Sequence, residues 1–203
     1  MRPDELPVPT LGREPAAEAR LDDIERFIAD SYPALVSFTQ GKTAGELARA
    51  FVWNSDRPPA TRPEQARSSL LLDGPGGAIV GLLQIYEGHP VASTWYVGLL
   101  VLDRSIRGQG HGARVVHDLL GEADRHGVAD IRVAVDLLNV DALRFWHGLG
   151  FDRIEKIVTR DPGYTLLELV NRRGEHPAPP GAAPPAPAGE SNRGSAAGNS
   201  CRS

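Results

Sequence analysis

The segment Leu99–Ala113 reads LLVLDRSIRGQGHGA and joins three patterns in a short space. Its apolar run, Leu99–Leu102, predicts the end of a buried strand. Glycines then stand at every second position, at Gly108, Gly110 and Gly112, and apolar residues at helical spacing follow them. A strand, a glycine-rich turn and a helix form the geometry in which free backbone N–H groups surround a phosphate. The segment therefore predicts a phosphate-binding loop.

The sequence on either side of this segment alternates between the two periodicities of secondary structure. Apolar residues at helical spacing predict four helices, which span Glu18–Tyr32, Thr43–Trp53, His111–His126 and Asp141–Leu149. Alternating or continuous apolar runs predict strands, which span Ser69–Asp73, Ile79–Tyr86, Thr94–Leu102, Ile131–Val135, Phe151–Thr159, Tyr164–Val170 and a short first one near Val8–Leu11. We expect an α/β (α+β) fold with six to seven strands and about four helices.

Local signals refine these boundaries. Pro33 is expected to end the first helix. Thr43 and Glu46 have the spacing of a capping box at the start of the second helix. Gly150 follows the last helix in the position of a left-handed C-terminal cap. Asn54–Arg67 holds three prolines, so we expect a loop there.

Composition and charge exclude several classes of protein. The chain has 203 residues, a net charge of −4 and a single cysteine, Cys201. A nucleic-acid binder would show a basic excess, a disulfide framework needs more cysteines, and no apolar run approaches the ~20 residues that span a membrane. Asp4 and Glu5 at the start are unlike a secretory signal. We expect a cytoplasmic protein that binds no nucleic acid, no membrane and no metal.

The chain divides into three parts. Residues 1–17 form an N-terminal segment with the short first strand, and residues 18–173 carry the other predicted elements as one domain. Residues 174–203 are rich in proline, alanine and glycine and contain no Val, Ile, Leu, Met, Phe, Tyr or Trp. Such a tail cannot bury enough apolar surface to offset the entropy of ordering it, so we expect it to be disordered.

The glycine loop fits a second pattern. Gly108–Ala113 matches the dinucleotide fingerprint G-x-G-x-x-G/A, and Asp136 closes the next strand. In that fold, however, the first glycine follows the strand almost at once, whereas Asp103–Arg107 intervenes here. Too few residues remain after Asp136 for the further strand–helix units of a dinucleotide fold. The nucleotide-triphosphate pattern G-x-x-x-x-G-K-[ST] fails because no lysine follows.

Two motifs together resemble the GNAT superfamily of acyl-CoA-dependent N-acyltransferases. The family's pyrophosphate loop is Q/R-x-x-G-x-G/A, which Arg107, Gly110 and Gly112 fill. Downstream, NVDALRFWHGLGF is similar to a second family segment, matched by Asn139, Ala142, Phe145, Leu149, Gly150 and Phe151. The resemblance covers residues 69–170. It implies a mostly antiparallel central sheet, acetyl-CoA as cosubstrate without a metal, and acetyl transfer to a primary amine of a small molecule or peptide.

The resemblance also implies which residues bind acetyl-CoA. The strand end would pair with the pantetheine arm and polarise the thioester carbonyl through the backbones of Leu100, Val101 and Leu102. The side chain of Asn139 would bond the same arm, or cap the helix that follows it. Arg107 could add positive charge or form a surface salt bridge, and His111 is interpreted as a solvated loop residue. The diphosphate would be held by Arg107, Gly108, Gln109, Gly110, His111, Gly112 and Ala113.

The acid and base are not evident from the resemblance. Many members carry a tyrosine acid seven residues after the asparagine, and some carry a glutamate base five residues before it; here these positions are Trp146 and Ala134. The candidate substitutes are Glu87, Asp136 and Tyr96, each of which also has a structural interpretation as a turn carboxylate, a turn cap or a packed ring. His89 has a suitable pKa but is expected in a surface loop beside Pro90.

Other functions stay open at this point. The absence of the tyrosine and the glutamate keeps a non-catalytic acyl-CoA-binding module as an alternative, and the glycine pattern keeps a dinucleotide-binding oxidoreductase. The negative net charge suits a cationic amine acceptor but does not identify it. The sequence also leaves a homodimer open.

Overall fold

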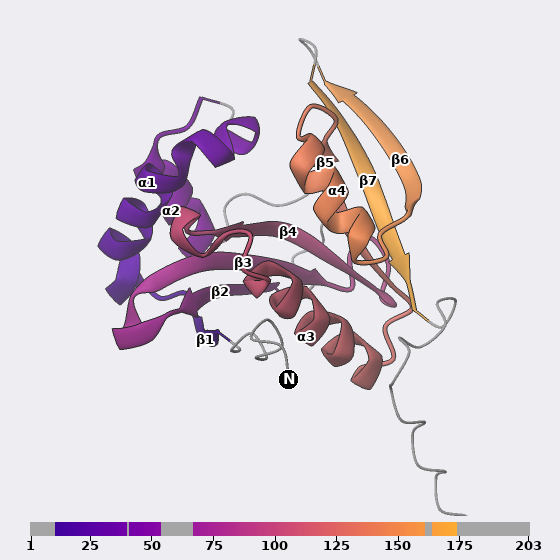
Figure 1. Cartoon of the computed structure of the whole chain (residues 1–203), viewed down its shortest axis with the longest axis horizontal. Coiled ribbons are helices and arrows are strands. Elements are labelled where there is room, and N and C mark those ends of the chain that lie inside the picture. The colour runs from indigo at the N-terminus through magenta and orange to yellow at the C-terminus, as the bar shows by residue number, and fades with distance from the viewer. Residues whose placement is uncertain (1–10, 40, 54–66, 161–163, 174–203) are drawn as a thin grey trace, which may run out of the picture.

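The structure is a computed structural model that describes residues 11–39, 41–53, 67–160 and 164–173. Its centre is a seven-stranded sheet in the order β1-β2-β3-β4-β5-β7-β6 (Figure 1). The strands are β1 (Gly12–Pro15), β2 (Arg67–Asp73), β3 (Ile79–Glu87), β4 (Thr94–Leu102), β5 (Asp130–Asp136), β6 (Arg153–Arg160) and β7 (Tyr164–Arg172). The helices are α1 (Leu21–Thr39), α2 (Ala44–Trp53), α3 (His111–Arg125) and α4 (Val140–Gly148), with short 3-10 turns at η2 (Glu18–Arg20), η3 (Pro75–Gly77) and η4 (Arg104–Ile106).

The strand pairing is mostly antiparallel, as predicted. All neighbouring pairs are antiparallel except β4 and β5, which run parallel. Parallel neighbours need a crossover connection, and α3 supplies it between β4 and β5. The predicted α/β (α+β) class is therefore confirmed.

Apolar side chains fill both faces of the sheet. One core, under α3 and α4, includes Val97 of β4 and Leu119 of α3. The other core, under α1 and α2, includes Val101 of β4 and Ile24 of α1. Figure 1 shows α1 and α2 on one side of β1–β4 and α3 on the other. These two cores confirm that β4 is a central strand covered on both faces.

The predicted helix signals are confirmed where the structure describes them. Thr43 and Glu46 form the capping box: the Thr43 backbone N–H donates to Glu46 Oε2 at 2.8 Å, and the Glu46 N–H donates to Thr43 Oγ1 at 3.3 Å. Gly150 has a φ of 84°, the left-handed conformation of a C-terminal cap. The buried residues of α3 all lie on one face: Val115, Val116, Leu119, Leu120 and Ala123.

The predicted end of the first helix is wrong, and the predicted first strand lies mostly outside the described residues. The first helix does not end at Pro33, since α1 continues to Thr39. A proline removes one backbone donor and strains one turn, and the Ala-Leu-Val run after it continues the helix past that local cost. Of the predicted first strand, Val8–Leu11, only Leu11 lies within the described residues, and the first described strand is β1, Gly12–Pro15. Its sequence, GREP, has no apolar alternation, so its pairing with β2 comes from tertiary context rather than local propensity.

Some expectations concern residues outside the described ranges: the loop of 54–66, the turn at 161–163 and the tail of 174–203. Among the residues that the structure describes, no helix combines the length and the apolar character that crossing a membrane requires. In the same part of the chain, no three His, Cys, Asp or Glu side chains gather in a group that could hold a metal ion.

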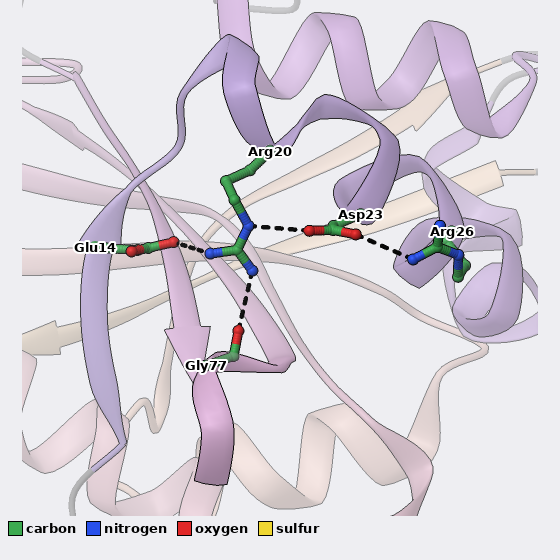
Figure 2. Close-up of polar contacts among 5 residues, drawn as sticks. All are labelled: Glu14, Arg20, Asp23, Arg26 and Gly77. Carbon is green, nitrogen blue, oxygen red and sulfur yellow. Dashed lines mark hydrogen bonds and ion pairs between the residues drawn. The ribbon is translucent and has the colours of Figure 1, made fainter.

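Arg20 ties the edge strand β1 to its neighbours (Figure 2). Its guanidinium contacts Glu14 of β1, donates to Asp23 of α1 at 3.1 Å, and donates to the backbone oxygen of Gly77 at 3.1 Å. Asp23 also accepts from Arg26, and the hydrogen bonds from Arg20 and Arg26 lower the pKa of Asp23. The short strand is thus held by side chains as well as by its backbone ladder.

Candidate functional site

The strands β4 and β5 run side by side for only part of their length. Their register pairs begin at Thr94 and end where Val97 faces Val133. Past this point both strands continue, and β4 stays paired with β3 on its other side. Figure 1 shows β5, β7 and β6 running in a different direction from β1–β4. The backbone groups of a strand point alternately to its two sides. On the side of β5, the N–H and C=O groups of Gly98–Leu102 therefore form no ladder hydrogen bonds with a described strand.

This divergence coincides with a bulge in β4. Against β3, Val97 pairs with Ile85 and Leu99 pairs with Gln84, so Gly98 is an extra residue between two pairs. A bulge increases the local twist of a strand and shifts the alternation of the side chains beyond it. The extra residue therefore lies at the point where β4 turns away from β5.

The turn after β4 is held by contacts among its own residues. The Ser105 hydroxyl and its backbone N–H, the latter at 2.8 Å, donate to Asp103 Oδ1, and these hydrogen bonds lower the pKa of Asp103. Arg107 donates from Nε to the carbonyl oxygen of Leu102 at 2.8 Å. Gln109 donates from Nε2 to the carbonyl oxygen of Ser105 at 2.6 Å. The loop is therefore organised by its own hydrogen bonds, and Asp103 has a structural role in it.

The glycines of this loop prepare an open helix N-terminus. Gly108 and Gly110 have φ values of 74° and 86°, which residues with a side chain rarely adopt. Gly110 is the N-cap of α3, no side chain caps it, and the first turn holds no acidic residue. The first helical bond runs from the Arg114 N–H to the Gly110 carbonyl at 3.0 Å. The N–H groups of residues 111–113 thus have no acceptor within the helix, and the helix dipole adds partial positive charge there.

Gly112 and His111 begin α3 and face inward. A Cβ on Gly112 would lie 3.2 Å from Phe145 Cε2 of α4 and 3.4 Å from Leu102 Cδ1, so this glycine allows close packing. His111 has a buried Nδ1 with no hydrogen-bond partner among the described residues. It is therefore not the solvated loop residue that the sequence suggested. An unpartnered buried nitrogen beside uncapped N–H groups fits a polar ligand at this loop.

Two polar residues, one at the end of β5 and one just after it, act as caps. Asp136 Oδ1 accepts a hydrogen bond from the Leu138 N–H at 2.9 Å, which organises the turn. Asn139 Oδ1 accepts from the Ala142 N–H at 3.1 Å and is the N-cap of α4. The capping interpretation of both residues is confirmed. The cap uses the side-chain oxygen of Asn139 and leaves its amide nitrogen to other partners.

The strand register decides which acid–base candidates share a face. Tyr96 lies between two β4 residues that pack toward α3, so it points to the face of α1 and α2. Asp136 follows a β5 residue that also packs toward α3, and it shares the face of Tyr96. Glu87 pairs with Trp95, whose ring packs toward α3. Cross-strand partners share a face, so Glu87 also lies on the face of α3, opposite to Tyr96. The structure brings Tyr96 and Asp136 to one face and places Glu87 on the other.

A carboxylate that sequence reasoning missed lies opposite Ala134. Ala134 pairs directly with Glu168 of β7. Glu168 accepts a hydrogen bond from Arg132 Nη1 at 3.0 Å, and Arg132 also contacts Asp130 at 3.1 Å and Glu155 at 3.5 Å. Only the pairing of β5 with β7 places Glu168 there, so no spacing along the sequence could have indicated it.

Trp146 belongs to the core. Its side chain is 6% exposed, and its ring centroid lies 5.1 Å from that of Phe145 and 4.9 Å from that of Phe151, both in edge geometry. An indole N–H donates a hydrogen bond but does not supply a proton. At the position of the family's tyrosine, this chain therefore has a packing residue.

His89 is buried, contrary to its expected place in a surface loop. It is 5% exposed, and its ring meets Tyr96 edge-on with centroids 5.3 Å apart and Tyr86 with centroids 6.5 Å apart. Burial lowers the pKa of His89 from its usual 6.5; the charge of Glu168 opposes this shift and that of Arg132 reinforces it. The imidazole is therefore neutral at pH 7 on the face that carries Tyr96.

Acidification is expected to destabilise the protein partly through His89. Because the pKa of His89 is lowered in the folded state, the unfolded chain takes up the proton first, and the free energy of unfolding falls as the pH drops below 6.5. Urea unfolding at about pH 7.5 and about pH 5.5 should show a smaller fall for His89→Gln than for the wild type. An equal fall in both proteins would contradict this role of the buried imidazole.

Structural comparisons agree with this architecture. An acetyltransferase from Thermus thermophilus has a TM-score of 0.62 at 22% identity, covering 82% of this chain and 99% of its own. A GCN5-related N-acetyltransferase from Kribbella flavida has a TM-score of 0.57 at 20% identity, covering 80% and 98%. The ribosomal-protein-S18-alanine N-acetyltransferase from Escherichia coli has a TM-score of 0.55 at 13% identity, covering 80% and 94%. At these identities the likeness concerns the fold.

The sequence comparison identifies the family. A search of curated proteins finds no match. A sequence profile of the acetyltransferase (GNAT) family matches residues 24–151, which include β4, the glycine loop, α3, β5 and α4. The chain belongs to the acetyltransferase (GNAT) family.

Proposed function

We propose that this protein transfers an acetyl group from acetyl-CoA to a primary amine of a small molecule or peptide, by direct attack in a ternary complex. The observation that carries the proposal is the free edge of β4, Gly98–Leu102, which the turn of residues 103–110 connects to the uncapped N-terminus of α3. One end of this path offers backbone groups to an amide-bearing arm, and the other offers N–H groups to a diphosphate.

The loop residues fit the diphosphate end of acetyl-CoA. The N–H groups at the start of α3 have no competing cap or first-turn carboxylate, and anions are stabilised at such a terminus. The unpartnered His111 Nδ1 lies at the same place. Arg107 is held against the Leu102 carbonyl and brings positive charge to the loop. Gly108, Gln109, Gly112 and Ala113 complete the proposed cradle, chiefly through their backbones.

The free edge of β4 fits the pantetheine and thioester end. By the alternation of the strand, the backbone groups of Leu100 and Leu102 turn to the free edge and, with the amide nitrogen of Asn139, would hold the arm, while Val101 between them bonds toward β3. Acetyl-CoA supplies an activated acetyl group when it is bound. An N–H donor fixed by the strand stabilises negative charge that develops on the carbonyl oxygen, without reorganising during the reaction.

We assign the proton transfers to residues on the face of the sheet that α1 and α2 cover. The amine nitrogen forms a bond to the carbonyl carbon, the carbon–sulfur bond breaks, and the electron pair leaves on the sulfur of coenzyme A. The amine loses one proton, which Asp136 accepts directly or through a water. Tyr96 lies on the same face and orients the amine. The thiolate takes a proton from solvent, since Trp146 supplies none.

A turnover assay with several amines tests this function. The purified protein is mixed with acetyl-CoA and a panel of polyamine, aminoglycoside, amino acid and peptide amines, and free thiol is measured. Saturable acetyl-CoA binding with amine-dependent thiol release is the expected result. Binding without release on any amine would favour the acyl-CoA-binding module, the alternative that Ala134 and Trp146 leave open. Tight NAD binding without coenzyme A binding would establish the dinucleotide alternative.

A further inference from the structure

The space beside Gly98 is filled by two polar side chains of β3. A Cβ on Gly98 would lie 2.6 Å from Tyr86 Cε2 and 3.0 Å from Gln84 Oε1. Gly98 is not among the glycines with positive φ, so this position requires space rather than an unusual backbone conformation. The ring and the amide therefore pack directly against the backbone of the bulge.

Tyr86 and Gln84 are bonded to each other in the interior. The Tyr86 hydroxyl donates to Gln84 Oε1 at 2.9 Å, and Gln84 Nε2 lies 3.5 Å from the Ser69 hydroxyl, which orients the amide. Tyr86 is 2% exposed and Gln84 is 9% exposed. A buried donor or acceptor that loses its partner is costly, so the pair is held in one arrangement.

We propose that Tyr86 and Gln84 are positioning residues, which fix the bulge at Gly98 and so the direction in which the free edge of β4 leaves β5. Three features meet at this glycine: the last pair with β5 lies just before it, the register with β3 shifts there, and the Tyr86–Gln84 pair occupies the place of its side chain. The inference rests on the proposed function, because the backbone that is positioned is the one that would hold the thioester.

This arrangement predicts a separation of turnover from affinity. A thioester displaced by about 1 Å loses on the order of a hundredfold in rate. The glycine loop keeps its own hydrogen bonds at the far end of the free edge, so the contacts with the diphosphate stay in place. Disturbing the pair should therefore lower kcat far more than it weakens the binding of acetyl-CoA.

Three variants test the pair. Gly98→Ala places a methyl group against the ring, and Tyr86→Phe keeps the ring but removes the hydroxyl. Each is expected to lower kcat by about tenfold to a hundredfold while the Kd of acetyl-CoA changes by less than about threefold. The double variant Gly98→Ala, Tyr86→Leu removes the clash with the ring but also the hydroxyl, so it should recover kcat no further than the level of Tyr86→Phe.

Asn171→Ala is the matched control. Asn171 is 2% exposed, donates from Nδ2 to the Leu149 carbonyl at 3.1 Å and accepts from Arg173 Nη1 at 3.0 Å, so this variant deletes partly buried hydrogen bonds far along β7. It should lower the thermal midpoint much as Tyr86→Phe does and leave kcat unchanged. A wild-type kcat in both Gly98→Ala and Tyr86→Phe would overturn the inference, and so would an equal loss of kcat in Asn171→Ala.

Amide hydrogen exchange keeps the inference testable if no amine is a substrate. In the protein without ligand, Tyr86→Phe should speed exchange at residues 98–102 by about tenfold relative to wild type, and Asn171→Ala should not. Unchanged exchange at these residues would overturn the positioning role. A wild-type protein that releases no thiol with any amine would instead overturn the proposed function alone.

Discussion

Gly110→Val is expected to weaken acetyl-CoA binding by about a hundredfold. Gly110 has a φ of 86° and caps α3, and a β-branched residue at such a φ is an outlier that costs about 1–3 kcal/mol. The backbone would relax out of that conformation, and the N–H groups of residues 111–113 would no longer converge on the diphosphate. Isothermal titration calorimetry with acetyl-CoA measures the change.

Gly127→Val is the matched control for this prediction. Gly127 follows the C-terminal end of the same helix with a φ of 66°, and no atom lies near the place of its Cβ. The control carries the same kind of backbone strain at the opposite end of α3. It should lower the thermal midpoint and leave the acetyl-CoA affinity unchanged. Equal affinities in the two variants would show that the N-terminus of α3 does not bind the diphosphate.

Trp146→Ala is expected to reduce the free energy of unfolding by about 3–5 kcal/mol, the range for removing a buried large aromatic residue. The indole is 6% exposed and packs edge-on against Phe145 and Phe151, so its loss leaves a cavity between α4 and the sheet. Urea unfolding followed by circular dichroism measures this loss.

Trp53→Ala is the comparison for that loss. The Trp53 side chain is 50% exposed, and a substitution at such a surface site changes stability by less than about 1 kcal/mol. Trp146→Phe should keep most of the packing and leave thiol release unchanged. Full stability of Trp146→Ala, or loss of turnover in a stable Trp146→Phe, would mean that Trp146 lines the site instead.

The sequence predicted most of the fold because its elements have strong local patterns. The apolar run Thr94–Leu102 marked β4 with the bounds that the structure shows, and the glycine pattern marked the turn into α3. Pro33 misled the prediction because a local preference for ending a helix was weaker than the tendency of the residues after it to continue one. The strand β1, Gly12–Pro15, was not predicted because an edge strand depends on its neighbour rather than on its own apolar pattern.

The candidate site was predictable only where its chemistry lies along one stretch of chain. The glycine loop and Asn139 are local, and the structure shows the turn and the cap that their sequence implied. The positions of His89 and Glu168 depend on how separate strands pair, and no spacing in the sequence encodes that pairing. The contact of Tyr86 with Gly98 depends in the same way on a bulge that only the register reveals.

The short ladder between β4 and β5 divides the sheet into two parts, β1–β4 and β5–β7–β6, which are joined over only a few residues. From Thr94 to Val97 backbone hydrogen bonds join the two parts, and beyond Val97 side chains on the face of α3 pack across them. A molecule bound along the free edge of β4 would replace the missing backbone hydrogen bonds and hold the two parts of the sheet in one orientation. In the proposed function that molecule is acetyl-CoA, so its binding would stiffen the sheet and the release of coenzyme A would loosen it.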